Sequence, residues 1–355
     1  MAKKVLVGMS GGVDSSVAAL LLKEQGYTVV GVTLRLRGGR LAELSGETAE
    51  QDIQDAQRVC AKLDIEHRVL DFTDRFCACV VDEFASEYLA GRTPNPCVTC
   101  NRTIKFGAML DYTLENGMDA LATGHYARTA YDEASGRWQL WCANSGKDQS
   151  YVLYGLSQQQ LSHTLFPLWG LEKARVRELA RLHALPVADK GDSMETCFVP
   201  KEGHAAFIEW YTGRTMQPGD FVDESGRVLG RHKGIGHYTI GQRKGLGIAL
   251  GQPMYVVELD AVNNRVILGV EGRQLSSELT AGRLNFVSIA PPEAPLRLHA
   301  KIRYQAPAAP ATLFPQTDGT ARLVFDAPQR SVTPGQAVVF YQDTLVLGGG
   351  TILHK

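Results

Sequence analysis

Twelve residues near the start of the chain, Val5 to Ser16 (VLVGMSGGVDSS), constrain the fold more than any other stretch. The apolar run at residues 5–7 predicts a buried strand, Gly11 and Gly12 permit a tight turn, and Val17 to Leu22 predicts a helix. A loop between a strand and a helix gathers backbone N–H groups at the positive end of the helix dipole, where an anion can bind. The expected donors are the backbone N–H groups of Ser10, Gly11, Gly12 and Val13 and the hydroxyls of Ser10, Ser15 and Ser16.

The residues that follow indicate an α/β fold with a parallel sheet. Further strands are expected at 27–34, 67–72 and 120–123, separated by helices at 51–63 and 76–89, and residues 35–46 have no clear period and predict a loop. Strand-helix-strand order favours parallel strands joined by right-handed crossovers. Ligands bind beyond the carboxyl ends of such strands, which places Leu34 near the anion site.

Composition indicates a globular protein of more than one domain. The chain has 355 residues, of which 44% are hydrophobic and 21% charged, and this length favours two or three domains. No apolar run approaches the roughly 20 residues that span a bilayer, and the sequence MAKKVLV leads directly into the first strand without a signal peptide. We therefore expect a cytoplasmic protein with no membrane contact.

The second half of the chain has a β-rich pattern. From Gly219 onward, short β-branched runs alternate with Gly, Pro and Asn-Asn turns, a pattern typical of strands and hairpins. We predict three domains: an α/β domain at 1–205, a small β-rich middle domain at 206–270, and a C-terminal barrel or sandwich at 271–355, with a barrel preferred.

Positive charge gathers in the same half, although the net charge is −1. Two stretches, 225–257 and 294–317, contain no acidic residue and are candidate nucleic-acid surfaces. Their basic residues are Arg227, Arg231, Lys233, Arg243, Lys244, Arg297, Lys301 and Arg303.

Seven cysteines, without a secretory signal, make a disulfide scaffold improbable and direct attention to reactive or metal-binding thiols. Helical spacing predicts that Cys60 is a core residue, and we interpret Cys77 and Cys79 as packing or surface thiols. Pro94 and Pro96 disfavour regular structure before Asn101, a candidate helix cap. Cys100 would then lie at the mouth of a helix, near Arg102 and Lys105, in surroundings that favour the thiolate.

Several motifs resemble those of one enzyme family. The first loop lacks the Gly-Lys-Ser/Thr of a Walker loop and resembles the SGGxDS loop of the ATP-pyrophosphatase (PP-loop) superfamily. Other stretches resemble the tRNA-specific 2-thiouridylases of that superfamily. They are TPNP with the following cysteines (93–100), GHYAR (124–128), KDQSY (147–151), a run ending in Cys-Phe (189–198) and GHYTIGQRKGLGI (236–248).

The resemblance implies the roles of individual residues. Asp14, Cys100 and Cys197 would be catalytic, with Asp14 as the magnesium or pyrophosphate partner. ATP would be held by Gly8, Met9, Ser10, Gly11, Gly12, Val13, Asp14, Ser15, Leu34 and Gly124. The tRNA would be contacted by Asn95, Pro96, Cys97, His125, Lys147, Asp148, Gln149, Arg303, Tyr304 and Gln336.

Cys97 departs from the family pattern, which often has Asp after TPNP. It creates a C-x-x-C unit with Cys100, which Cys197 could join in space. Three thiolates are what related tRNA thiolases use to hold a 4Fe-4S cluster, whereas persulfide chemistry resolved by a disulfide explains the same residues without a metal. Cys97 as an incidental replacement is the third interpretation, and persulfide transfer is the leading one.

The resemblance implies ATP-dependent 2-thiolation of the wobble uridine in tRNA, with ATP and Mg²⁺ as cofactors. The partners would be the tRNA anticodon loop and a sulfur donor such as a cysteine desulfurase or a sulfur-relay protein. Two alternatives stay open. An amide-forming ligase of the PP-loop superfamily would leave the paired cysteines without a role, and a non-catalytic RNA-binding module would have no need for Asp14.

Overall fold

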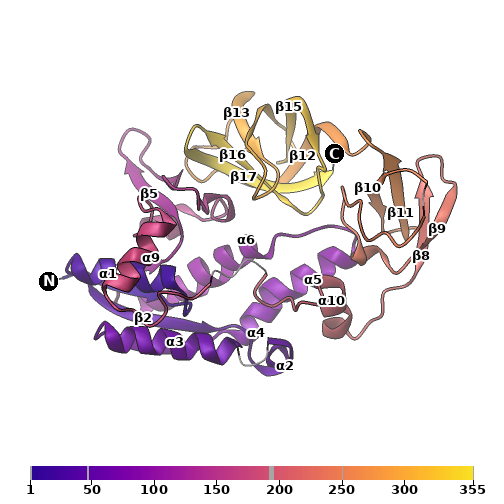
Figure 1. The fold of residues 1–355 in the computed structure, drawn as a ribbon. Helices are drawn as coiled ribbons and strands as arrows, with labels where there is room; N and C mark the ends of the chain where they lie inside the picture. The colour runs from indigo at the N-terminus through magenta and orange to yellow at the C-terminus, as the bar shows by residue number, and fades with distance from the viewer. Residues whose placement is uncertain (1, 46–47, 192–195, 250, 355) are drawn as a thin grey trace.

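The computed structural model describes residues 2–45, 48–191, 196–249 and 251–354. Within these ranges the chain forms three parts (Figure 1): an α/β domain, a barrel that lies over it, and a smaller β-rich domain beside both. No helix in the described part of the chain is long and apolar enough to cross a membrane.

A parallel sheet organises the first domain, as predicted. Its strand order is β3-β2-β1-β4-β7. The chain passes from β1 to β2 on one side and later reaches β4 on the other, so the order reverses between β1 and β4, where α/β proteins bind ligands. The strands are β1 (Lys4–Gly8), β2 (Thr28–Arg35), β3 (Glu66–Asp71), β4 (Ala120–Thr123) and β7 (Thr164–Leu165).

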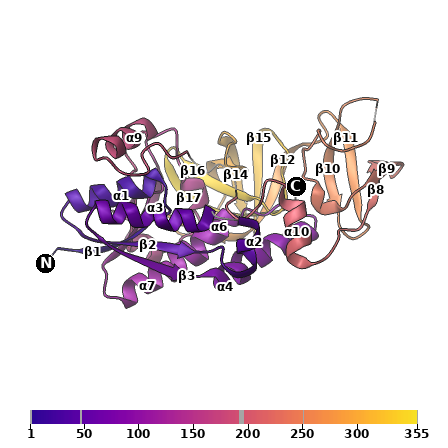
Figure 2. The same ribbon diagram turned by 60° about the horizontal axis from the view of Figure 1, so that its bottom comes forward.

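Alternating side chains of β1 serve two cores. Val5 and Val7 pack with the helices on one face of the sheet, and Leu6 packs on the other face beneath the barrel, because successive strand residues point to opposite sides. Figure 2 shows the helices on the two faces. The first face carries α1 (Val13–Glu24), α3 (Thr48–Lys62) and α9 (Lys173–Leu182), and the second carries α7 (Met109–Glu115).

The predicted loop at 35–46 is wrong in part, because it contains a 3₁₀ turn (Gly39–Leu41) and the short helix α2 (Ala42–Ser45). Leu41 is buried in a cluster with Phe76 and Phe84, and this tertiary contact outweighs the weak local pattern. The helix predicted at 76–89 is present. It runs through α4 (Thr73–Phe76), a π-helical segment (Cys77–Val81) and α5 (Asp82–Leu89).

The helix that carries Cys100 begins earlier than predicted. Pro96 is the first residue of α6 (Pro96–Cys100), a position where its missing N–H costs nothing. A π-helical segment (Asn101–Ala108) then leads into α7. The predicted cap at Asn101 is therefore wrong: Asn95 holds the cap position, and the buried Asn101 amide donates to the Val152 carbonyl at 3.0 Å.

The middle domain is a four-stranded mixed sheet of order β10-β11-β8-β9 in the described residues. β8 and β11 are parallel, and the other pairs are antiparallel. Phe221, Val256 and Leu268 are among its buried core residues. Its elements are α10 (His204–Thr212), β8 (Gly219–Asp223), β9 (Val228–His232), β10 (Met254–Asp260) and β11 (Arg265–Val270).

The C-terminal domain is an antiparallel barrel, which confirms the preferred prediction. Its strands follow the order β12-β15-β14-β13-β16-β17, and pairing of β12 with β17 closes the circle. The strands are β12 (Leu275–Asn285), β13 (Leu296–Lys301), β14 (Ala309–Pro315), β15 (Ala321–Arg330), β16 (Ala337–Gln342) and β17 (Leu345–His354).

The hairpin predicted at 131–143 is present as β5 (Ala127–Asp132) and β6 (Arg137–Cys142), but it belongs to the barrel sheet. β6 pairs with β17, with Leu345 opposite Trp141 and Val346 opposite Leu140. The first domain thus contributes two strands to the sheet of the third.

Candidate active site

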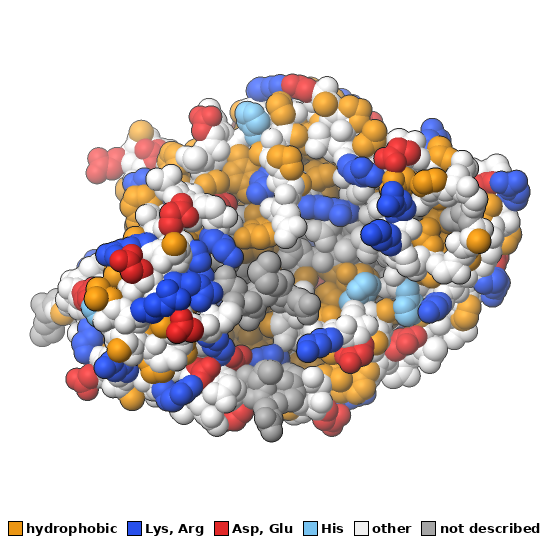
Figure 3. Space-filling model, viewed as in Figure 1, with side chains coloured by type: hydrophobic (Ala, Val, Ile, Leu, Met, Phe, Trp, Pro, Cys, Tyr) orange, Lys and Arg blue, Asp and Glu red, His pale blue; other side chains and the backbone are white. Residues whose placement is uncertain are grey.

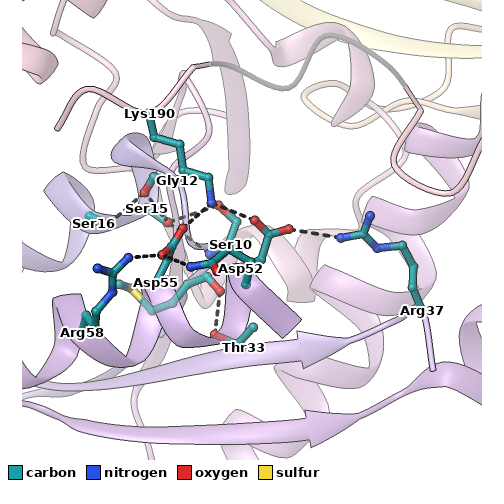
Figure 4. Close-up of polar contacts among 12 residues, drawn as sticks. Ser10, Gly12, Ser15, Ser16, Thr33, Arg37, Asp52, Asp55, Arg58 and Lys190 are labelled. Atoms are coloured by element: carbon teal, nitrogen blue, oxygen red, sulfur yellow. Dashed lines mark hydrogen bonds and ion pairs between the residues drawn. The ribbon is translucent and has the colours of Figure 1, made fainter. Parts of the chain in front are cut away.

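The loop after β1 has the strand-to-helix geometry that the sequence predicts. Gly11 has φ +71°, and a Cβ added there would lie 2.4 Å from the Asp52 carbonyl oxygen, so only glycine fits. The hydroxyls of Ser15 and Ser16 donate to the Gly12 carbonyl at 3.2 and 2.8 Å (Figure 4). Ser15 and Ser16 are both buried, and the Ser15 hydroxyl also accepts from the Ser10 N–H at 3.1 Å. Both hydroxyls therefore stabilise the turn, and the prediction that they meet an anion is wrong. Ser10 is exposed.

Asp14 joins three elements at the start of α1. Both of its carboxylate oxygens accept hydrogen bonds from Lys173 Nζ, at 2.7 and 2.8 Å, and the Tyr126 hydroxyl donates to Oδ1 at 2.7 Å. Lys173 is the first residue of α9 and was not singled out from the sequence, where no motif marks it. The contact places an ammonium group beside the loop.

Gly124 lies directly against the loop. A Cβ there would be 2.6 Å from the Ser15 nitrogen and 2.8 Å from the Asp14 carbonyl carbon. The carboxyl end of β4 therefore lies in backbone contact with the first turn of α1, and this close approach requires glycine. Met9 and Val13 are buried, so only their backbone can face a nucleotide, and Leu34 is half-buried at the carboxyl end of β2.

The GHYAR and KDQSY segments hold each other. The Gln149 backbone N–H donates to the Tyr126 carbonyl at 2.8 Å, and the Gln149 side chain accepts from the Tyr126 N–H at 3.1 Å. Asp148 accepts from the Ala143 N–H at 2.8 Å and from the Ser150 hydroxyl at 2.8 Å. Asp148 and Gln149 thus stabilise the fold locally, and Lys147 is the exposed member of the motif.

His125 is held in apolar surroundings. Its Nδ1 lies 2.8 Å from Thr123 Oγ1, and its ring lies 5.8 Å from that of Phe106. Burial, with Lys105 nearby, holds the pKa of His125 well below its usual range. The ring is therefore neutral at physiological pH and offers a stacking face.

Three cysteines lie in one region. Cys97 and Cys197 are exposed, and Cys100 is buried in a cluster with Phe76 and Phe198. Burial raises the pKa of Cys100 to about 12, while Lys105 lowers it and the other two thiols raise it. The expected thiolate-favouring environment is therefore wrong, because α6 begins at residue 96 and its first turn packs Cys100 into the core.

Cys197 is the last cysteine of the chain and belongs to the run at 189–198. Of the run ending in Cys-Phe, residues 192–195 lie outside the described residues. The Cys197 side chain is exposed at the surface, yet the protein groups around it displace solvent and raise its pKa. Cys60 is buried as predicted, and Cys77 and Cys79 are half-buried. Among the described residues, no three His, Cys, Asp or Glu side chains are placed to hold a metal ion.

Three protein-family models together match nearly the whole chain. Residues 3–201 match the family described as tRNA methyl transferase HUP domain, residues 205–270 the tRNA methyl transferase PRC-barrel domain, and residues 276–352 the aminomethyltransferase beta-barrel domain. The tRNA-specific 2-thiouridylase MnmA of Acetivibrio thermocellus is 51% identical, covering 99% of this chain and 99% of that protein. The enzymes of the same name from Trichormus variabilis and Heliobacterium modesticaldum are 50% and 49% identical, covering 99% and 100% of this chain and 98% and 94% of theirs.

The chain belongs to the tRNA-specific 2-thiouridylase family. Membership confirms the family and enzyme class predicted from the motifs. The amide-forming ligase and the non-catalytic RNA-binding module are thereby set aside.

In this thiouridylase the barrel reaches back to the cysteine-bearing segment. The Gln336 amide donates to the Thr93 and Pro94 carbonyls at 2.9 and 3.4 Å. The Tyr304 hydroxyl donates to the Asp148 carbonyl at 3.0 Å, while the side chain keeps 41% of its surface exposed. Both residues therefore lie next to the segments that the family motifs assign to tRNA.

Arg303 is engaged within the protein. Its guanidinium donates to the Ile240 and Ser331 carbonyls at 3.1 and 3.2 Å and to the Thr333 hydroxyl at 2.8 Å. It joins the barrel to the middle domain, so the expectation that it takes a phosphate is not supported.

Several basic residues of the two acid-free stretches are paired with acidic residues from other parts of the sequence. Arg227 pairs with Asp223 at 3.0 Å and Arg231 with Asp220 at 2.9 Å, and Arg297 pairs with Asp326. In the view of Figure 3, Asp and Glu side chains lie among the Lys and Arg side chains of the surface. Lys244 is exposed and remains a candidate for phosphate contact.

Proposed function

We propose that this thiouridylase uses ATP to replace the C2 oxygen of the wobble uridine in tRNA by sulfur, in the cytoplasm. The observation that carries the proposal is that Cys197 lies close enough to Cys100 to raise its pKa, in a domain whose first loop matches the PP-loop at every motif position. Identity of about half over the full chain with enzymes named for this activity supports it.

ATP is proposed to bind where β1 and β4 end. The N–H groups of Gly11, Gly12 and Val13 at the positive end of α1 would face the pyrophosphate, whereas that of Ser10 donates to the Ser15 hydroxyl. The absence of a side chain at Gly124 leaves room there. Carboxylate oxygens are the ligands that Mg²⁺ prefers, so Asp14 fits as its ligand. The ion, when bound, would neutralise charge on the phosphates. Lys173, whose ammonium donates to both Asp14 oxygens, would add positive charge beside the phosphates.

The first step is adenylation. The C2 oxygen of the uridine attacks the α-phosphorus of ATP, the bond to pyrophosphate breaks, and pyrophosphate leaves. The C2 oxygen thereby becomes part of AMP, a good leaving group. Loop N–H groups held in place before ATP binds would lower the activation barrier of this step, because they stabilise charge on the phosphates as it develops.

Sulfur transfer is proposed to use both cysteines. The terminal sulfur of a persulfide on Cys197 attacks C2, and AMP leaves with the former C2 oxygen. Cys100 then loses its proton to solvent, a loss that Lys105 nearby favours. The resulting thiolate attacks Cys197 Sγ, and the bond between that Sγ and the transferred sulfur breaks to leave 2-thiouridine. In a variant of this route Cys100 attacks first and releases sulfide, which attacks C2. Both routes end in a Cys100–Cys197 disulfide, which a thiol reductant must reduce with two electrons and two protons.

The iron-sulfur route is not supported by the side chains as they lie. Within the described ranges, Cys97, Cys100 and Cys197 do not form a group placed to hold a metal. We derive no step through a cluster.

The tRNA anticodon loop is proposed to bind between the first domain and the barrel. A cavity of about 320 Å³ lies there, lined by Asn95, Arg102 and Arg283 among others. Asn95, Pro96, Cys97, His125 and Lys147 would meet the RNA from one side, and Tyr304 would offer an exposed ring for stacking. Gln336 would act by holding the backbone of Thr93 and Pro94. The exposed Cys197 could receive sulfur from a desulfurase or a relay protein.

The test is nucleoside mass analysis after incubation with ATP, a persulfide source, a thiol reductant and unmodified tRNA. We expect 2-thiouridine and one AMP per thiolated tRNA. Cys100→Ala and Cys197→Ala should form none, and Cys77→Ala serves as the control at a half-buried thiol outside the site. AMP formation that does not depend on RNA, or thiolation by Cys197→Ala, would overturn the proposal.

A further inference from the structure

One carboxylate lies between two positively charged side chains, and one of these, Arg37, also contacts the backbone of Cys197. Asp52, on α3, accepts from Lys190 Nζ at 2.8 Å through Oδ1 and from an Arg37 guanidinium nitrogen at 3.1 Å through Oδ2. The other terminal nitrogen of Arg37 donates to the Cys197 carbonyl at 3.0 Å. Figure 4 shows Arg37, Asp52 and Lys190 in line. We call these three residues the Asp52 clamp.

A second carboxylate strengthens the clamp. Lys190 Nζ also donates to Asp55 at 2.6 Å, and the Asp55 side chain is only 7% exposed. Burial would raise the pKa of Asp55, but hydrogen bonds from Lys190, Arg58 and Gln51 outweigh it and lower the pKa to about 2. Asp55 is thus ionised at physiological pH. Removing one charge from this partly buried network leaves an opposite charge without its partner. The loss of stability is therefore larger than that on breaking an exposed ion pair.

The clamp also touches the nucleotide loop. The backbone of Asp52 is the group that a Cβ on Gly11 would meet, 2.4 Å from its carbonyl oxygen and 2.9 Å from its Cα. Asp52 therefore contacts the loop through its backbone and both clamp cations through its side chain. Arg37 comes two residues after the end of β2, at the carboxyl edge of the sheet where the nucleotide is expected.

We propose that Asp52, Arg37 and Lys190 are positioning residues that hold Cys197 at a fixed place relative to the nucleotide loop. The proposal rests on the function assigned to Cys197 above. Because the clamp contacts the backbone of Cys197 and leaves its sulfur free, it sets where the persulfide stands when the adenylated uridine forms. Loss of the clamp should slow sulfur delivery and leave adenylation intact.

Two variants test the clamp, with a matched control. Asp52→Ala removes the shared carboxylate but keeps the backbone that meets Gly11. Arg37→Lys keeps the positive charge, but a single ammonium group cannot reproduce two separate guanidinium nitrogens on Asp52 and Cys197. Glu50→Ala is the control, because Glu50 lies on the same helix and forms an exposed pair with Arg35 at 3.2 Å.

The first readout separates the two chemical steps. In Asp52→Ala and Arg37→Lys we expect the kcat of thiolation to fall about tenfold or more, the loss typical of a misplaced reacting group. The single-turnover burst of pyrophosphate and the KM for tRNA should stay within about twofold of the unmodified enzyme. A merely structural role would lower both steps together, so that result overturns the proposal.

The second readout needs neither ATP nor tRNA. Alkylation of Cys197 relative to Cys97 in one sample, measured by mass spectrometry, reports the surroundings of Cys197 directly. We expect the ratio to change by about threefold or more in Asp52→Ala and to stay constant in Glu50→Ala, because thiol reactivity follows its local environment. An unchanged ratio together with normal kcat in both clamp variants overturns the proposal. If the unmodified enzyme forms no 2-thiouridine, the proposed function fails, and the alkylation ratio still decides the clamp.

Discussion

Because Cys100 is buried, its rate of alkylation should be low at neutral pH and should rise steadily as the pH is raised. Burial raises the pKa of this thiol from 9.0 to about 12, and only the thiolate reacts. At pH 8 an ordinary thiol is about one-tenth ionised, whereas Cys100 would be about one ten-thousandth ionised, which is about a thousandfold less. We expect Cys100 to be the slow thiol of the C-x-x-C unit and exposed Cys97 the fast one.

The assay is timed alkylation with iodoacetamide between pH 7 and about pH 10.5, followed by digestion. Tandem mass spectrometry separates the two cysteines, which share one tryptic peptide. The logarithm of the Cys100 rate should rise with a slope of one and without a plateau over this range. A plateau near pH 9 would refute the burial argument, because steric shielding alone slows the rate without moving the pKa.

The same pKa sets a stability trend. The folded state holds the Cys100 proton more tightly than the unfolded chain does, so this contribution is fully present below the unfolded pKa of 9.0. It is lost as the pH rises toward the folded pKa of about 12. Thermal melts at increasing pH should therefore show a falling Tm above pH 9, with a smaller fall in Cys100→Ala.

Four further predictions concern other parts of the site. Asp14→Asn should abolish pyrophosphate release while changing the free energy of unfolding by only about 1 kcal/mol, because its partly exposed pair with Lys173 contributes little to stability; normal turnover would remove Asp14 from the mechanism. Gly124→Ala places a Cβ 2.6 Å from the Ser15 nitrogen and should raise the KM for ATP about tenfold, whereas Gly146→Ala, with nothing within 4 Å, should not. Arg303→Ala should lower the free energy of unfolding by about 1–3 kcal/mol through its lost hydrogen bonds. Lys244→Ala should instead reduce the log-log slope of tRNA affinity against salt by about 0.7 to 0.9 without destabilising the protein. The opposite pattern would show that Arg303, and not Lys244, contacts a phosphate. Anaerobically purified enzyme should thiolate tRNA fully without iron, and loss of activity together with bound iron in Cys97→Ala would instead favour the cluster.

The sequence predicts well those features that depend on neighbours along the chain. The buried strand before Gly11, the turn it permits and the alternating runs of the barrel are local patterns, and the motifs at Cys100 and Cys197 indicate the family. Local patterns do not show which distant side chains meet. Lys173 reaches Asp14 across 159 residues, and no spacing rule predicts that pair.

Burial and long-range partners also explain the incorrect predictions. Cys100 has cationic neighbours in the sequence, yet its thiol faces Phe76 and Phe198, which are brought there by other segments. Arg303 was expected to meet phosphate from its acid-free surroundings, but backbone carbonyls at 240 and 331 capture its guanidinium. A single sequence shows which charges are nearby along the chain, and only the fold shows which acceptors compete for them.

The β5–β6 hairpin has a consequence for synthesis on the ribosome. Its partner strand β17 lies about 200 residues further along the chain. The outer edge of β6 must therefore stay unpaired until β17 has emerged. Such non-local pairing slows folding, and an open strand edge invites pairing with other chains. Chains interrupted before β17 would leave that edge uncovered, so we expect them to aggregate more readily than chains that contain β17.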